Sequence, residues 1–118
     1  MLTYMPDKTE TLLSRLISGD QAAVAAVLAG ARTSETPAVL VAAALICGDS
    51  DGLLLARAMT HATTTRDRQL VAVATAHLEG DHDLFDALIR DHLADHPDNV
   101  LAAWIATRHT QRHVPSTH

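Results

Sequence analysis

Residues 66–96 read RDRQLVAVATAHLEGDHDLFDALIRDHLADH and are followed by Pro97-Asp98-Asn99. On both sides of Gly80-Asp81, apolar residues recur every three or four positions, which places them on one face of a helix. The glycine ends the first helix and the aspartate caps the second, while Pro97 marks a second stop. The stretch therefore predicts two helices, at about 65–79 and 82–95, that fold as a hairpin.

The rest of the chain repeats this arrangement. Gly19-Asp20 and Gly48-Asp49 mark turns in two earlier helical pairs, at a spacing of roughly 30 residues that is typical of helical solenoids. The other predicted helices cover about 7–18, 20–32, 37–47, 53–61 and 99–113. We therefore expect an all-α fold of about seven helices, stacked as antiparallel hairpins, with one domain at 1–113 and a frayed tail at 114–118.

Composition limits the class of protein. The 118 residues are 47% hydrophobic and 3% aromatic, which predicts one globular domain whose core is built from Ala, Leu, Val and Ile. The net charge of −5 argues against a nucleic-acid partner. The longest apolar run, 38–47, is far shorter than the ~20 residues of a membrane span. With a single cysteine, Cys47, and no signal peptide evident, we expect a cytoplasmic protein with an inert, buried thiol.

The hairpin resembles a tetratricopeptide repeat. Gly80-Asp81, Leu93 and Pro97 fall at the positions of that family's turn, large apolar residue and proline. The segments 66–68, 76–81 and 93–97 (RDR, AHLEGD and LADHP) resemble segments of a group of bacterial proteins, which are named for their similarity to tetratricopeptide repeat protein 38. The resemblance covers about 66–106, whereas in the first half only the Gly-Asp turns and the helix lengths agree, so the register of the first two repeats stays open.

The resemblance implies a right-handed superhelix whose inner helices line a concave surface for peptides or proteins. It places Leu70, Ala74, His77 and Arg108 on that surface. The sequence departs from the family pattern at Gln69, where an aromatic residue is expected, and at His92, where a small one is expected. Trp104 also sits one place later than the family tryptophan. The function expected from the resemblance is non-catalytic binding of a protein or peptide partner, without a cofactor.

Eight histidines suggest an alternative function, a small metal- or ligand-binding protein. The pairs His92/His96 and His109/His113 have the spacing that brings two imidazoles to one helix face, as a zinc site requires. Neither pair has the glutamate of an HExxH motif. His77 and His92 each interrupt an apolar stripe, where a histidine is more often a hydrogen-bonded core or groove residue than a metal ligand.

The apolar surface of the last predicted helix suggests that two chains associate. This helix carries Leu101, Trp104 and Ile105 among alanines, so it is apolar on every side, and no eighth helix follows to cover it. The end units of solenoids need a polar outer face. We therefore expect a homodimer formed through this C-terminal helix.

Two acidic segments each have two interpretations. The loop Gly48-Asp49-Ser50-Asp51-Gly52 could bind calcium, but it lacks the downstream glutamate of such loops, so we expect a helix-helix turn with capping residues. Six aspartates between positions 81 and 98 form either a solvated helix face or a patch for a basic partner.

Overall fold

The computed structural model describes residues 8–112 and contains helices but no strands within that range. The helices are α1 (Lys8–Ile17), α2 (Gln21–Gly30), α3 (Pro37–Cys47), α4 (Leu53–His61), α5 (Thr65–Glu79), α6 (His82–Asp95) and α7 (Val100–Arg112). The prediction of an all-α fold with seven helices is confirmed for this part of the chain, whereas the predicted tail at 114–118 lies outside it.

The helix boundaries follow from local residues. Pro37 starts α3, and Gly48 ends it in the left-handed conformation at φ 85°. Gly80 ends α5 in the same way, at φ 74°. The side chain of Asp81 then accepts a hydrogen bond from the Leu84 amide and caps α6. These signals explain why the predicted spans of α3, α4 and α6 agree with the structure.

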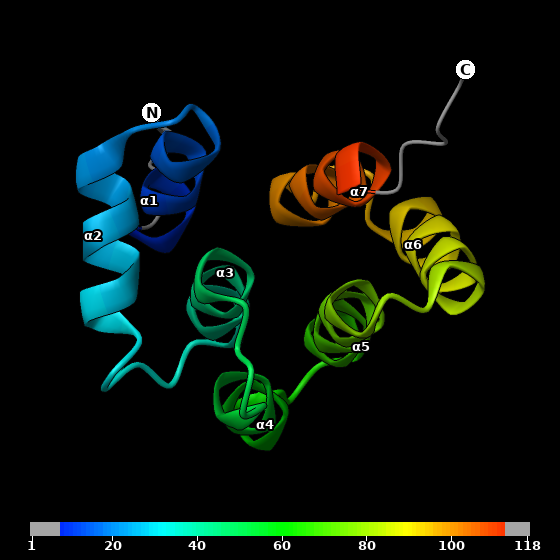
Figure 1. Cartoon of the computed structure of the whole chain (residues 1–118), viewed down its shortest axis with the longest axis horizontal. Coiled ribbons are helices and arrows are strands. Elements are labelled where there is room, and N and C mark those ends of the chain that lie inside the picture. The colour runs from blue at the N-terminus through cyan, green and yellow to red at the C-terminus, as the bar shows by residue number, and fades with distance from the viewer. Residues whose placement is uncertain (1–7, 113–118) are drawn as a thin grey trace, which may run out of the picture.

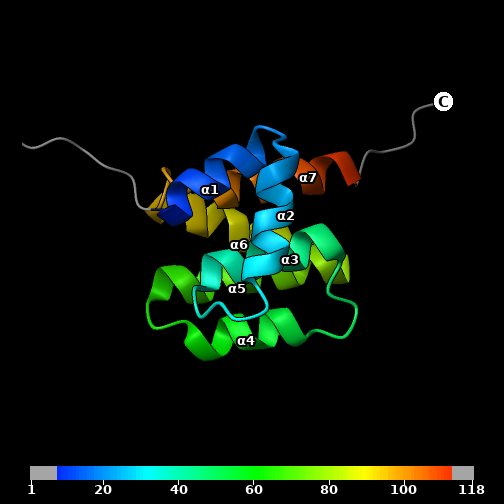
Figure 2. The same cartoon turned by 90° about the vertical axis from the view of Figure 1, so that its left-hand side faces the viewer.

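The odd-numbered helices form the inner part of the molecule and the even-numbered helices lie outside them (Figure 1). α3 packs against α1 and α5, α5 packs against α7, and α7 packs against α1. Figure 2 shows α1 and α7 together at one end of the molecule, with α4 at the other. The first and last described helices therefore close the inner side, which an open helical array would leave accessible.

α3 is the centre of the core. Residues Val39 to Leu45 are all buried, because α1, α2, α4 and α5 pack around this helix. The expectation that a helix apolar nearly all round is enclosed on more than one side is confirmed. Three consecutive alanines, Ala42 to Ala44, allow neighbouring helices to approach it closely. One cluster of buried residues extends from Leu13 to Ile105, so α1 to α7 share a single core.

α7 is covered by helices of its own chain. Leu101 and Ile105 are fully buried and Trp104 is partly buried, since α1, α5 and α6 all pack against α7. The homodimer prediction assigned this cover to a second chain because the sequence predicts no further helix after α7. The cover comes instead from the start of the chain, so the dimer stays a prediction without that argument. No helix within residues 8–112 is both long enough and apolar enough to cross a membrane.

Replacing Ile105 tests this placement of α7. Ile105 is 0% exposed, so Ile105→Ala should lower the free energy of unfolding by about 2–5 kcal/mol. Val100, on the same helix, is 51% exposed, and Val100→Ala should change it by no more than about 0.5 kcal/mol. Denaturant unfolding followed by Trp104 fluorescence measures both.

The concentration dependence of unfolding shows whether α7 is covered by helices of its own chain or by a second chain. If the chain itself covers α7, the unfolding midpoint is constant over roughly a hundredfold range of protein concentration. A midpoint that rises with concentration in the wild type, and no longer rises in Ile105→Ala, would place Ile105 between two chains.

Candidate functional site

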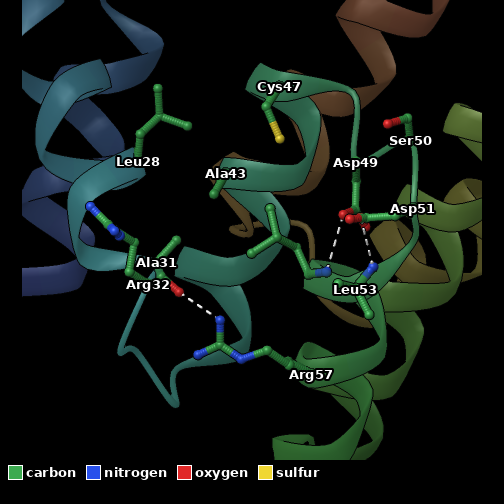
Figure 3. Close-up of a pocket in the computed structure, with 11 residues that line it drawn as sticks. Leu28, Ala31, Arg32, Ala43, Cys47, Asp49, Ser50, Asp51, Leu53 and Arg57 are labelled. Carbon is green, nitrogen blue, oxygen red and sulfur yellow. Dashed lines mark hydrogen bonds between the residues drawn. The ribbon is translucent and has the colours of Figure 1, made fainter.

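A cavity of about 530 Å³ opens between α2, α3 and the start of α4 (Figure 3). It is lined by Leu28, Ala31, Arg32, Ala43, Cys47, Asp49, Ser50, Asp51, Leu53, Leu54 and Arg57. The Arg57 guanidinium donates to the carbonyl oxygens of Ala31 and Ser34 at 2.8 and 2.9 Å. α4 is thereby fastened to the segment that joins α2 to α3, which keeps the shape of the cavity.

The acidic loop Gly48-Asp49-Ser50-Asp51-Gly52 forms one side of this cavity and caps α4. The Asp49 carboxylate accepts from the backbone amides of Leu54 and Leu55 at 3.1 and 3.0 Å. Asp51 accepts from the Leu53 amide at 3.2 Å. Both carboxylates therefore neutralise the positive end of the α4 dipole, and the predicted capped turn is confirmed.

The edge of the cavity carries one leucine from α2, one leucine from α4 and an arginine that follows α2. Leu28 and Leu53 are 37% and 62% exposed, which is high for leucine, and Arg32 is also exposed (Figure 3). Cys47 is exposed as well, so the prediction of a buried thiol is wrong. The cause is its position at the last residue of α3, where the apolar run leaves the core. Leu28 and Leu53 therefore leave apolar surface exposed on two sides of the cavity.

The predicted groove residues lie mostly in the core. Leu70, Ala74 and His77 are 3%, 0% and 4% exposed, because α3 and α7 pack against α5. Arg108 is exposed, and its Cζ atom lies 4.8 Å from the centroid of the Trp104 ring. His77, Arg108 and Cys47 line a second cavity, of about 540 Å³. Of the four residues, the structure thus brings only His77 and Arg108 to a common hollow.

Three histidines join α5, α6 and α7. The Nδ1 atoms of His77 and His109 are 2.9 Å apart, and His109 Nε2 lies 2.8 Å from Nδ1 of His82. Phe85 stacks on the His109 ring, with centroids 3.8 Å apart and an interplanar angle of 15°. His77 and His109 are both buried. In each of these nitrogen pairs, one nitrogen must carry the proton and donate it, and the other must be unprotonated and accept it. The positions of the protons on the three rings therefore depend on one another.

Another histidine, His92, joins the same three helices at the start of α7. His92 is 0% exposed, and its Nδ1 lies 2.9 Å from Oε1 of Gln69 on α5. Its Nε2 lies 2.8 Å from Nδ2 of Asn99, whose Oδ1 accepts from the Ala102 amide and so caps α7. Asn99 must therefore donate to His92 Nε2, and His92 must donate from Nδ1 to Gln69. These bonds require a neutral imidazole with its proton on Nδ1.

The surroundings of His92 favour this neutral form. Burial lowers the pKa of His92 from its usual value, and the positive charges of His96 and Arg66 lower it further. The carboxylate of Asp95 raises that pKa but does not outweigh the other effects. His92 is consequently uncharged at neutral pH, as its two hydrogen bonds require.

The histidine pairs predicted to bind metal do not form such a site in the described residues. Both nitrogens of His92 are hydrogen-bonded, and its ring centroid is 5.1 Å from that of His96. Both nitrogens of His109 face other histidines, and His113 lies outside residues 8–112. Within that range, His, Cys, Asp and Glu side chains form no group of three or more that could hold a metal ion. A metal at His92 would have to displace Asn99 and remove the α7 cap.

Sequence reasoning identified His77, His92 and His109 but not what they contact. It did not predict that His82, Gln69 and Asn99 contact them, because each of these residues lies outside the helix of the histidine that it meets. A signal was nevertheless present: the two departures from the repeat pattern, at Gln69 and His92, are hydrogen-bonded to each other. The one substitution supplies the polar partner that the other needs when it is buried.

The exposed aspartates of α6 leave both interpretations of the acidic run open. Asp83, Asp86, Asp91 and Asp95 are exposed, and Asp81 caps the helix.

Comparison of the chain with protein-family models, with curated proteins and with solved structures finds no match in any of the three.

The exposure of Cys47 leads to a prediction about its reactivity. A thiol on the edge of an open cavity should react fully with Ellman's reagent in the folded protein, at a rate within about tenfold of that in the unfolded chain. Absorbance of the released thiolate measures this, and Cys47→Ser supplies the blank. Reaction that begins only when denaturant unfolds the chain would place the thiol in the interior.

Proposed function

We propose that this protein is a non-catalytic interaction module that binds a peptide segment of a partner protein in the cavity between α2, α3 and α4. The observation that carries the proposal is the pair of exposed leucines, Leu28 and Leu53, on the edge of a cavity of about 530 Å³. Apolar side chains in that setting lower the free energy of a complex by about 25 cal/mol for each Å² they bury.

The charges around the cavity suggest the chemistry of the segment. Arg32 is exposed beside Leu28, and the Arg57 guanidinium donates hydrogen bonds to two carbonyl oxygens. Asp49 and Asp51 lie on the opposite side, where helix amides occupy their carboxylates (Figure 3). A segment with two or three apolar residues and an acidic residue directed at Arg32 would match this distribution.

The choice of cavity differs from the surface implied by the tetratricopeptide resemblance. That resemblance supports binding of peptides by a helical array, and we retain it as part of the proposal. The inner surface of the array is closed by α1 and α7, with Leu70 and Ala74 buried, whereas the cavity on α2, α3 and α4 is open. The exposed free thiol of Cys47 suits the reducing cytoplasm that we propose as the location.

Selection from a displayed peptide library against the full chain tests the proposal. We expect enriched peptides that combine apolar residues with an acidic residue, and Leu53→Asp should weaken their binding at least tenfold. The physical reason is a charged side chain at the place where the partner's apolar residues would be buried. Leu84→Asp is the matched control, because Leu84 is 45% exposed on α6 and does not line the cavity. Fluorescence anisotropy of a labelled peptide measures both variants.

A charge reversal tests the orientation of the segment. Arg32→Glu should weaken the acidic peptides and strengthen versions in which lysine replaces the acidic residue. Enriched peptides whose affinity is unaffected by both Leu53→Asp and Arg32→Glu would show that the partner binds elsewhere. A selection that enriches no peptide above the background of a library with no protein would contradict the proposal that the chain binds peptides.

A further inference from the structure

Both ends of α7 are fastened to α5 and α6 by hydrogen bonds that limit how many protons the histidines can carry. At its start, Asn99 donates to His92, which donates to Gln69. Near its end, His109 bonds to His77 of α5 and to His82 of α6. The free energy that holds α7 in place therefore depends on pH, since histidine is the side chain that titrates near neutral pH.

The bond at the start of α7 does not tolerate a proton on His92 Nε2. A protonated ring presents N–H groups on both sides, so Nε2–H would meet the N–H of Asn99 at a distance of 2.8 Å. Rotation of the Asn99 amide would offer its oxygen to the ring. It would also turn the NH₂ group towards the Ala102 amide, which now donates to Asn99 Oδ1, and α7 would lose its cap.

The chain of three rings near the end of α7 tolerates one added proton but not two. When all three rings are neutral, each of the two nitrogen pairs has one donor and one acceptor. One added proton can make His109 the donor in both pairs, which leaves His77 and His82 as acceptors. A second added proton must place N–H against N–H in at least one pair, and that contact breaks.

Groups of both signs lie around the two sites. Arg66 from α5 and His96 from α6 face His92, where Asp95 is the opposing charge. Arg108 from α7 and the titratable Cys47 from α3 line the cavity that His77 reaches. Asp81 precedes His82, but its carboxylate caps α6 at the Leu84 amide. Protonation of His92 therefore adds positive charge beside Arg66, which opposes it in the closed structure.

We propose that α7 is an acid-released lid: a proton binds His92 when α7 separates from α5 and α6, because the closed form keeps Nε2 of that ring as an acceptor, so acid favours the open form. Opening uncovers Leu101 and Ile105, which are buried under α7's neighbours, and exposes His77, which contacts His109. The cavity between α2, α3 and α4 contains no residue of α5, α6 or α7 and keeps its shape. The lid is thus independent of the proposed peptide site.

The sign of the effect follows from linkage. The pKa of His92 is lowered in the closed form, and in the open form it returns towards the ordinary value of about 6.5. The open form consequently binds more protons below that pH. The opening equilibrium then increases by about tenfold per pH unit for each proton taken up, until the pH falls to the pKa of the closed form. Above pH ~7 the equilibrium is insensitive to pH.

Hydrogen exchange on the full chain tests the lid. Amide protection is measured by NMR from about pH 7.5 to 5.0, corrected for the intrinsic exchange rate at each pH. We expect protection at residues 101–107 of α7 to fall about tenfold or more per pH unit below ~6.5, while protection at 41–45 of α3 changes less than twofold. Protection of α7 that does not change with pH, or that falls together with α3, overturns the proposal.

A single substitution should reverse the pH dependence. In Asn99→Asp, one carboxylate oxygen still caps Ala102, and the other accepts a hydrogen bond from a protonated His92, so protection of α7 should increase from pH ~8 to ~6. His61→Gln is the matched control, because His61 on α4 belongs to neither group, and it should behave as the wild type. If His61→Gln abolishes the response, or Asn99→Asp retains the wild-type direction, the assignment to His92 is wrong.

The tautomer of His92 provides a test on the wild-type protein, for which no variant has to fold. Nitrogen-15 NMR of the wild-type imidazoles at pH ~7.5 should show His92 with its proton on Nδ1 and an unprotonated Nε2. A proton on Nε2 at that pH would contradict the bond from Asn99 and overturn the proposal.

Discussion

The arrangement of the last three helices depends on a buried imidazole that must remain uncharged. His92 has no exposed surface, yet it is polar, so both of its nitrogens need partners inside the protein. Gln69 and Asn99 supply them from α5 and from the start of α7. A buried donor or acceptor left without a partner costs about 1–3 kcal/mol. The requirement to satisfy one ring therefore sets both the position of α7 and the register of α5 against α6.

The closed inner side of the molecule follows from the small side chains of the central helix. α3 presents alanines where α1, α2, α4 and α5 approach it, so the helices pack closely without aromatic residues to fill the gaps. α2 is seen from the side in Figure 1, whereas α3, α4 and α5 are seen nearly end-on, so α2 crosses these helices. This crossing places α1 beside α7. A regular stack of parallel hairpins would instead leave α7 uncovered on that side.

Local sequence was sufficient to predict the helices but not their contacts. Gly48, Gly80 and Pro37 act on their own turn of backbone, so the boundaries of α3, α4 and α6 could be predicted from neighbouring residues alone. Cys47 was misplaced because an apolar run does not show which of its residues lies at the end of a helix facing solvent. The His92–Asn99 and His77–His109 bonds join residues of different helices, and their geometry depends on where α7 packs. The closure by α1 joins opposite ends of the described chain, and local periodicity carries no information about it.

The two notable regions of the molecule differ in how their polar groups are satisfied. Around the cavity on α2, α3 and α4, Asp49, Asp51 and Arg57 bind backbone atoms. These bonds use carboxylate and guanidinium groups, and none of them involves an imidazole. Around α7 the same function falls to histidines, whose hydrogen bonding changes when a proton is added. The inward-facing positions of α5, α6 and α7 could equally have carried apolar residues, which satisfy a core at any pH. Because His92 occupies one of these positions and bonds to the cap of α7, the proposed lid ties the stability of the C-terminal helix to proton concentration.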